Sequence, residues 1–313
     1  MHLNKIQETF TPLQQSGTRI DKLLAQNFTQ ITRENFKKEI KGGNVLVNGE
    51  KTKPNYVTRE HDKIEVDISF QETIRKTIAN SNIEINVLYE HSDFLIIEKP
   101  AGISVHPSEK EPDETLANGL IAKFPKLQNI GENPMRPGIV HRLDKYTSGL
   151  LIVPKNQTAF DFFKDLFKNH GVIKQYSAIC WGTLSKKEGL VSLYIGRSKS
   201  NPLKQSTSKY ASKLGSAKQA LTKYKLQKES LDKTKSLILT MPKTGRKHQI
   251  RVHLHSIGHP IVGDKMYQLE KHTQENKDFK RFLLHASQLK FSYADGKKYE
   301  FNSPIPEEFF DGF

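Results

Sequence analysis

The sequence predicts an α+β protein: a large domain built on a mixed, mostly antiparallel β-sheet, preceded by a small N-terminal α/β domain. Two observations support this prediction. From residue 85 onward most apolar segments are short, strand-like runs, with clear helical patterns only at 156–170 and 245–258. Residues 1–72 instead place two helical patterns before a hairpin, and residues 73–84 lack periodicity and indicate a linker to the domain at 85–313.

The N-terminal domain is predicted to contain two helices, a hairpin and a strand, in that order. Residues 18–28 place four apolar side chains on one helical face. Thr32 is a suitable N-cap for a second helix, and Gly42-Gly43 ends it because glycine favours the position after a helix C-terminus. Asn48-Gly49 is a strong signal for a tight hairpin turn, and residues 62–68 alternate as a half-buried strand does.

The large domain is predicted from short apolar runs bounded by turn residues. Asn156 is a suitable N-cap for the helix at 156–170, and Gly258 closes the helix at 245–258. Asp295-Gly296 marks a hairpin within 289–303. Strands are expected at 86–90, 94–99, 172–182, 190–196, 220–227 and 236–241, with two further buried β-segments at 139–140 and 150–153.

Composition excludes several classes of protein. The 313 residues are 35% hydrophobic and 27% charged, which is typical of a soluble globular protein. No apolar run approaches the roughly 18 residues of a membrane span, and the first residues lack the apolar core of a secretory signal. The single Cys180 permits neither an internal disulfide nor a cysteine-based zinc site. We therefore expect a cytoplasmic protein that has no association with membranes.

The net charge of +15 is concentrated in one part of the sequence. Residues 196–251 contain 15 Lys or Arg residues and only two acidic ones, whereas residues 1–70 are nearly neutral. This indicates a binding surface for a polyanion, and a generic basic surface is the alternative. Within 197–228 the lysines recur every four or five residues, which favours a flexible basic loop. These lysines are Lys199, Lys204, Lys209, Lys213 and Lys218.

Residues 139–153, IVHRLDKYTSGLLIV, place charged side chains between two apolar runs. Three interpretations of Asp144 are open. It caps Thr147 or Ser148 in a loop, it belongs to a phosphoryl-transfer site, or its cationic neighbours keep it ionised as a nucleophile or base. Phosphoryl transfer lacks support, because the chain has neither a G-x-G-x-x-G loop nor an Asp-Phe-Gly sequence.

A second charged segment, residues 244–264, contains Arg246, Lys247, His248 and Arg251. In a helix, His248 and Arg251 would be neighbours on one face. The histidines of this segment lack the His-Glu-x-x-His spacing of a zinc site, so no metal is predicted.

Five segments in the large domain, taken in order, resemble the RluA family of RNA pseudouridine synthases. The N-terminal segment at 44–66 resembles the S4 RNA-binding domain, which in RluD-like and RluC-like members precedes the catalytic domain. The resemblance covers about residues 17–310. The five segments are EKPAGISVHP (98–107), RPGIVHRLDKYTSGLLIV (136–153), KQYSAICWG (174–182), KTGRKHQIRVHLHSIGHPIVGDKMY (243–267) and LLHASQLKF (283–291).

The resemblance implies that the protein isomerises uridine to pseudouridine in RNA without a cofactor. It implies that Asp144 is the catalytic aspartate, that Arg251 pairs with it, and that Tyr176 stacks on the target base and takes part in proton transfer at C5. A flipped-out uridine would reach Asp144, and Arg142 would fill the space that it leaves. The predicted RNA-binding residues are Arg142, His141, Lys145, Arg246, Lys247, His248, Lys199, Lys204, Lys209, Arg19, Arg33, Lys37 and Lys38.

The loop at 196–224 aligns best with RluD-like members, which implies a large-subunit (23S-type) ribosomal RNA or a pre-ribosomal particle as the partner. Transfer RNA is the alternative substrate. A non-catalytic RNA-binding or ribosome-assembly factor on the same fold is the alternative function, and the presence of Asp144, Tyr176 and Arg251 counts against it. A monomer is the default expectation.

Overall fold

The computed structural model describes residues 4–12, 15–28, 31–70 and 76–313. The chain divides into two compact units, Met1–Arg75 and Lys76–Phe313, which are described separately below. In the described ranges, no helix combines the length and the apolar character needed to cross a membrane.

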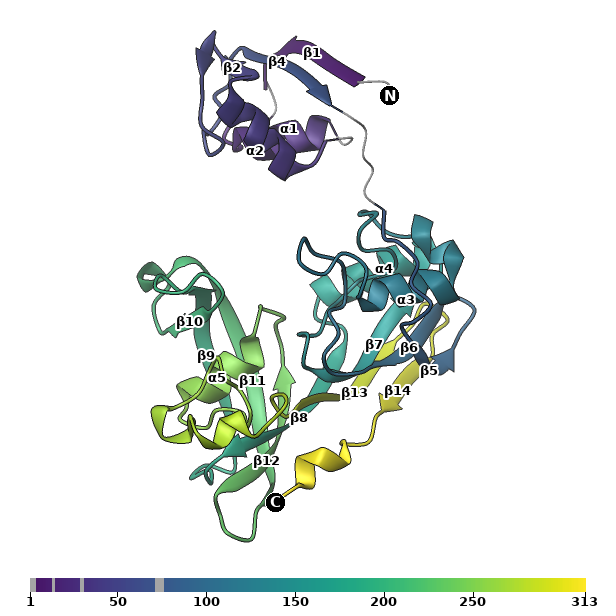
Figure 1. The fold of residues 1–313 in the computed structure, drawn as a ribbon, viewed down its shortest axis with the longest axis vertical. Helices are drawn as coiled ribbons and strands as arrows, with labels where there is room; N and C mark the ends of the chain where they lie inside the picture. The colour runs from purple at the N-terminus through teal and green to yellow at the C-terminus, as the bar shows by residue number, and fades with distance from the viewer. Residues whose placement is uncertain (1–3, 13–14, 29–30, 71–75) are drawn as a thin grey trace. The chain divides into compact units, whose positions relative to one another are not determined.

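The first unit is a four-stranded antiparallel sheet, in the order β1-β4-β2-β3, with two helices packed on it (Figure 1). The Thr32 side chain caps the second helix by accepting a hydrogen bond from Asn35 N, and Gly43 follows it with φ +86°, both as predicted. Asn48 and Gly49 both have positive φ, as a two-residue hairpin turn requires. The elements are β1 (Asn4–Phe10), α1 (Ile20–Asn27), α2 (Arg33–Gly42), β2 (Val45–Val47), β3 (Glu50–Lys51) and β4 (Ile64–Phe70).

The predicted element order lacked β1. This strand pairs along its whole length with β4, about 60 residues further along the chain, from Lys5 against Ser69 to Phe10 against Ile64. The residues of β1 are mostly polar and give no strand signal of their own, so pairing with the distant β4 determines its conformation.

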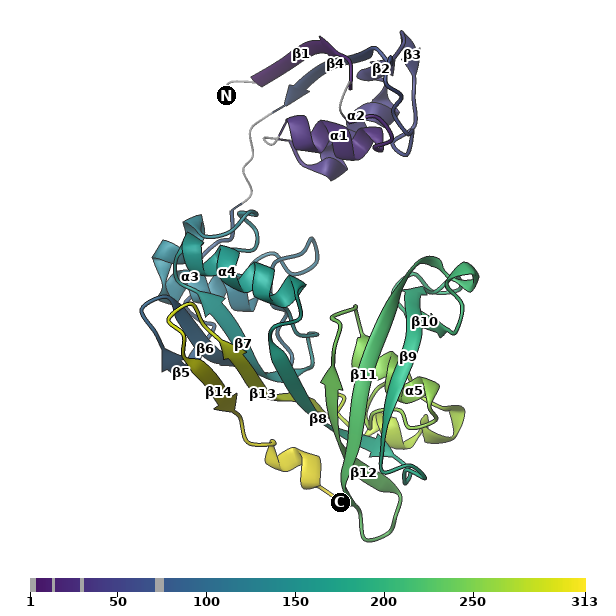
Figure 2. The same cartoon turned by 180° about the vertical axis from the view of Figure 1, so that it is seen from behind.

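The second unit contains one ten-stranded sheet in the order β10-β9-β11-β12-β8-β13-β7-β6-β5, with β14 paired to β13 (Figures 1 and 2). Among the described strand pairs only β7 and β13 are parallel, which confirms the mixed, mostly antiparallel sheet. The strands are β5 (Asn86–Glu90), β6 (Phe94–Lys99), β7 (Ser148–Pro154), β8 (Ile173–Trp181), β9 (Glu188–Arg197), β10 (Gln205–Ser208), β11 (Gly215–Glu229), β12 (Lys235–Pro242), β13 (Leu284–Ser292) and β14 (Lys298–Asn302).

Three α-helices accompany this sheet. Asn156 caps α4 as predicted, its side chain accepting from Ala159 N. The helix α3 was not predicted, because almost all of its residues are buried and it shows little amphipathic contrast. The helices are α3 (Leu116–Lys123), α4 (Gln157–Lys168) and α5 (Gln249–Ser256), with short 3₁₀ turns at Pro125–Asn129, Ala211–Lys213, Glu270–His272, Glu275–Lys277 and Glu307–Phe310.

The strands β6 and β7 are buried on both faces. Ile96 and Ile152 pack in one cluster with Phe163 of α4, whereas Leu95 and Leu151 belong to the cluster on the other face. Burial on both faces explains why these segments form continuous apolar runs rather than alternating ones.

The parallel contact between β7 and β13 is short, with only His285 against Ser148 and Ala286 against Gly149 in register. The backbones are very close here: a Cβ on Gly149 would lie 2.4 Å from the Ala286 carbonyl oxygen, and Gly149 has φ +110°. Only glycine fits this position.

The predicted β-segment at 139–140 is wrong, because these residues belong to an irregular loop. The predicted helix at 245–258 begins only at Gln249, since His248 before it has φ +56°, outside the helical region. The predicted flexible loop within 197–228 is instead largely β-sheet: Gln205–Ser208 pair with β9, and β11 begins at Gly215. Backbone pairing of this kind does not depend on the charged side chains that suggested a loop. We call residues 197–219 the basic arm.

Candidate active site

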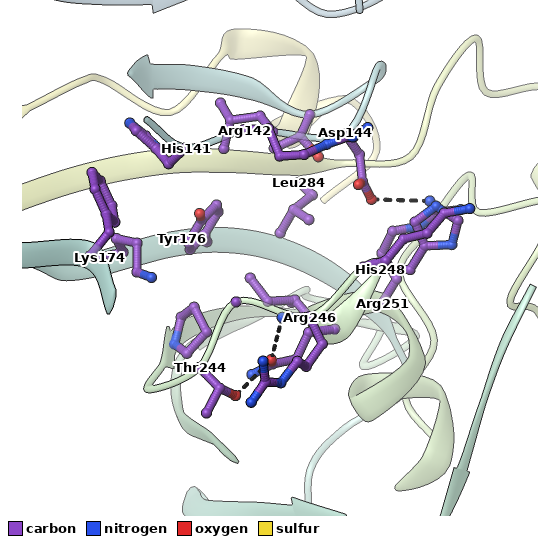
Figure 3. Close-up of a pocket in the computed structure, with 18 of the residues that line it drawn as sticks. His141, Arg142, Asp144, Lys174, Tyr176, Thr244, Arg246, His248, Arg251 and Leu284 are labelled. Atoms are coloured by element: carbon purple, nitrogen blue, oxygen red, sulfur yellow. Dashed lines mark hydrogen bonds and ion pairs between the residues drawn. The ribbon is translucent and has the colours of Figure 1, made fainter. Parts of the chain in front are cut away.

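A cavity of about 680 Å³ lies in the second unit, where the loop before β7 faces the segment that leads into α5 (Figure 3). The two charged segments of the sequence therefore meet across it, as the resemblance implied. Of the described residues that line it, seven are Lys or Arg and one, Asp144, is acidic. The cavity is lined by Val140 to Asp144, Thr147, Lys164, Phe167, Lys168, His170, Lys174, Tyr176, Pro242, Thr244 to Arg251, and Leu284.

Arg251 connects two carboxylates. Its Nη1 donates to Asp144 Oδ2 at 3.2 Å, while Nε and Nη2 donate to the two carboxylate oxygens of Asp264 at 2.7 and 2.9 Å. The guanidinium also lies over the ring of Phe282, at 4.2 Å from its centroid, and over that of Tyr267, at 5.0 Å. The rings therefore contact the faces of the planar guanidinium, while the two carboxylates bind its edge.

Burial and charge act in opposite directions on Arg251. Burial by itself would lower the pKa of its guanidinium, but the hydrogen bonds and negative charges of Asp264 and Asp144 outweigh burial and raise the pKa above the usual value. The side chain, only 7% exposed, is therefore a permanent cation. Asp144 is more accessible, at 22%, and faces the cavity.

Asp264 was not predicted as a site residue, although it lies in one of the segments that carry the resemblance. It is fully buried and accepts hydrogen bonds from the backbone N–H groups of Met266 and Tyr267, both at 3.0 Å. Gly263 before it has φ +79°, and a Cβ there would lie 2.2 Å from the Arg281 carbonyl oxygen. In the sequence, the signal for this residue was a glycine followed by an aspartate after an apolar run. Spacing alone could not identify Arg251 as the partner of that aspartate.

A buried lysine holds the loop that carries Asp144. Lys99 is fully buried, and its ammonium group donates to the carbonyl oxygens of Pro100, Ile103 and Lys145 at 2.6, 2.9 and 3.0 Å. Burial and the nearby charge of Arg281 lower its pKa to about 7. Because Lys145 follows Asp144 directly, this contact holds the loop in place next to Asp144. Lys99 lies in the first of the five segments, and the sequence assigned it no contact.

Tyr176 lies on β8 and lines the cavity. In the view of Figure 3 it lies, together with Leu284, between the Asp144–Arg251 pair and Lys174. Burial and the nearby charge of Asp144 raise the pKa of its phenol, so the hydroxyl group is un-ionised at neutral pH. Lys174 is two residues away on the same strand, and alternation places both side chains on one face.

Three predicted RNA-binding residues surround Asp144 in the chain, and their contacts differ. The His141 ring stacks on Phe167 at 4.4 Å, and its Nε2 accepts from Ile152 N at 2.9 Å. Burial and nearby Lys174 lower its pKa to about 3, so the ring is neutral. Lys145 pairs with Glu111. Arg142 is exposed, and its one described side-chain contact is with His106 at 3.4 Å.

The second group, Arg246 to His248, forms the opposite rim. Gln249 holds this loop by accepting from Arg246 N and from the Thr244 hydroxyl group. His248 Nδ1 lies 2.8 Å from the Tyr267 hydroxyl oxygen. Burial lowers the pKa of His248 to about 4, so its ring is neutral. The Tyr267 oxygen in turn accepts from Gln205 N of the basic arm, at 2.7 Å.

The remaining predicted RNA-binding residues lie outside the cavity. Lys199 and Lys209 are exposed on the basic arm and Lys204 is half-buried there. In the first unit, Arg19 and Arg33 both bind the fully buried Asp21, whose pKa their hydrogen bonds lower despite the opposing effect of burial. Lys37 pairs with Glu34 at 2.5 Å and Lys38 is exposed.

In the ranges that the structure covers, no group of three or more His, Cys, Asp or Glu side chains is arranged to hold a metal ion.

Comparison with protein families gives two matches along the chain. Residues 93–256 match the family described as RNA pseudouridylate synthase, and residues 18–64 match the S4 domain. The first match contains Asp144, Tyr176 and Arg251, whereas Asp264 lies beyond its end.

Similar proteins extend these matches over nearly the whole chain. An uncharacterized RNA pseudouridine synthase of Bacillus subtilis (strain 168), YlyB, is 35% identical over 296 residues, which are 94% of this chain and 93% of the relative. The ribosomal large subunit pseudouridine synthase D of Borreliella burgdorferi is 33% identical over 313 residues, 97% of this chain and 91% of the relative. A solved human structure, RNA pseudouridylate synthase domain containing 1, superposes with a TM-score of 0.60 at 27% identity, over 72% of this chain and 86% of that chain.

Proposed function

The chain belongs to the RNA pseudouridylate synthase family, and on that premise we propose that it converts specific uridines of large-subunit ribosomal RNA to pseudouridine. As a member of that family, and with relatives named RNA pseudouridine synthases, it is an enzyme of the isomerase class. Several relatives at 31–33% identity are named ribosomal large subunit pseudouridine synthase D, which supports the choice of RNA.

The observation that carries the proposal is a single accessible carboxylate among the described residues of the cavity, Asp144, in surroundings otherwise rich in cations. Arg251 donates a hydrogen bond to Asp144 and places a positive charge beside its carboxylate. The surrounding positive charge attracts a polyanion. The cavity is large enough to hold one nucleotide that has left its base stack. A flipped uridine in this cavity would meet the carboxylate directly.

The isomerisation needs no external reactant. The N1–C1′ bond of uridine breaks, uracil turns, and a C5–C1′ bond forms; C5 loses a proton and N1 gains one. Asp144 serves the first stage in any of three ways: by attack on C1′, by addition to the uracil ring, or by removal of a sugar proton. All three use the carboxylate that Arg251 contacts at the edge of the cavity.

Tyr176 suits a different task. Its aromatic face, in the same cavity as Asp144, fits stacking on the uracil base. Its hydroxyl group is un-ionised, so it would relay the proton that leaves C5 by releasing its own proton as it accepts that one. Arg142, exposed at the rim, fits the space that the flipped uridine leaves in the RNA, because a guanidinium both stacks and donates hydrogen bonds.

The experiment is to map pseudouridines by carbodiimide modification and primer extension in cells that lack the protein, and in the same cells supplied with wild type or with Asp144→Asn. We expect large-subunit sites that disappear on deletion and return only with wild type. The single-residue change should lower turnover by at least about 10²–10⁴-fold while RNA binding persists.

Other outcomes have definite meanings. If pseudouridines were lost only from transfer RNA, transfer RNA and not ribosomal RNA would be the substrate. Sites restored by Asp144→Asn would overturn the role of the aspartate. A deletion that changes ribosome assembly but no pseudouridine, with full rescue by Asp144→Asn, would identify a non-catalytic assembly factor.

A further inference from the structure

Lys174 is a cation in the cavity without an acidic partner. Among the described residues, no carboxylate lies within ion-pairing distance of its ammonium group, and the group donates no hydrogen bond there. Its one described interaction is with the ring of Phe167, at 5.6 Å from the centroid. Two buried cationic side chains of this unit do have partners: Arg251 binds two carboxylates, and Lys99 donates to three carbonyl groups.

The surroundings of Lys174 make an unpaired positive charge unfavourable in the RNA-free protein. The side chain is partly withdrawn from solvent, and burial alone lowers its pKa, with no carboxylate to offset it. A cation removed from water without a counter-charge is unfavourable, and an incoming anion removes the penalty. Neutral His141 and Phe167 on that side cannot provide a counter-charge.

The position of Lys174 matches the chemistry of a nucleotide. It stands two residues from Tyr176 on the same face of β8, roughly 7 Å along the strand. Figure 3 shows Lys174 at the opposite side of Tyr176 from Asp144. If the base lies on Tyr176, its sugar–phosphate backbone can pass within reach of the ammonium group.

We propose that Lys174 binds a backbone phosphate of the RNA next to the target uridine, so that the cavity holds the base at Tyr176 and the phosphate at Lys174 together. The proposal rests on the proposed function, since it assumes an RNA substrate. It assigns a ligand to a side chain that takes no part in the Asp144–Arg251–Asp264 group.

The test measures the binding of a fluorescein-labelled oligouridylate of about ten nucleotides by fluorescence anisotropy at several salt concentrations. Lys174→Met should weaken binding and reduce the slope of log Kd against log salt by about 0.7, the value for one phosphate contact in a single strand. Lys174→Arg should keep the slope. The matched control is Lys290→Met, which removes a lysine paired with Glu300 outside the cavity and should leave the slope unchanged.

Contrary results are equally specific. A Lys174→Met slope equal to that of wild type, or a wild type that fails to bind the oligouridylate at about 50 mM salt, would overturn the proposal. A loss of kcat at saturating RNA with an unchanged slope would show that Lys174 only supports Tyr176. Binding is measured without turnover, so a failure of the pseudouridine mapping and a failure of the lysine assignment are separate results.

Discussion

Arg251 gives its two shorter hydrogen bonds to Asp264 and only its third, at 3.2 Å, to Asp144. Asp264 is fully buried, whereas Asp144 is partly exposed to the cavity. The arginine is therefore held by a carboxylate outside the cavity, and it donates one further N–H group to the carboxylate that lines the cavity. This arrangement leaves most of the oxygen lone pairs of Asp144 available for chemistry.

Asp264→Ala should destabilise the second unit by about 3–5 kcal/mol, because it leaves a buried guanidinium with a single partner. Turnover should fall as well, since Arg251 loses its orientation. Trp181, the only tryptophan of the chain, lies in this unit, so its fluorescence in urea reports the unfolding free energy. The control Glu300→Gln breaks an exposed pair with Lys290 and should cost less than about 1 kcal/mol. Equal destabilisation of both variants would contradict the prediction.

Tyr267→Phe should raise KM for RNA more than it lowers kcat. The substitution removes the acceptor for Gln205 N, at the base of the basic arm, and the partner of His248, while the ring stays under Arg251. The loss in stability should be about 1–2 kcal/mol. Steady-state kinetics on the mapped RNA checks the division between KM and kcat, and Tyr299→Phe, at a surface hairpin, is the matched change. A pure loss of kcat would argue against a link to the arm.

Replacing Lys199, Lys204 and Lys209 by Ala should weaken RNA binding and flatten its salt dependence, by roughly one unit of slope for each phosphate that the arm no longer neutralises. The triple replacement of Lys290, Lys297 and Lys298, on the hairpin of β13 and β14, removes the same charge and should change the slope little. Titrations at several salt concentrations distinguish the two. Identical slopes in the two triple variants would mean that only net charge matters.

The second unit should lose stability in acid through His141. Its folded pKa is about 3, against 6.5 for the ordinary side chain, so between these values the unfolded chain binds more protons and stability rises with pH. Lowering the pH from 6.5 to 5 should therefore cost roughly 1–2 kcal/mol at this site. His141→Gln should flatten the pH dependence of Trp181-monitored unfolding, while the exposed control His170→Asn should not. Some slope should remain, because burial also lowers the pKa of His248; a slope identical to that of wild type would contradict the prediction.

Local patterns in the sequence predicted most elements because their causes are local. Thr32 and Asn156 cap helices through their own neighbours, and the Asn48-Gly49 turn needs only positive φ at both residues. The strand β1 and the helix α3 were not predicted, since distant pairing and near-complete burial determine them.

In the candidate site, too, local patterns did not predict the features that distant contacts or burial determine. The contact between Arg251 and Asp144, 107 residues apart, was expected from the family resemblance and not from spacing. Asp264 and Lys99 were not predicted because burial and partners give them their importance, and neither property can be inferred from an aspartate or a lysine alone. The left-handed backbone of His248, which shortens α5, likewise has no signal in its residue type.

The close approach of β7 and β13 at Gly149 lies beside two walls of the cavity. Thr147, just before β7, and Leu284, the first residue of β13, both line it. A methyl group at position 149 would push the two backbones apart and carry these two walls with them. The absence of this one carbon atom therefore sets how closely the two strands that carry these cavity walls can lie.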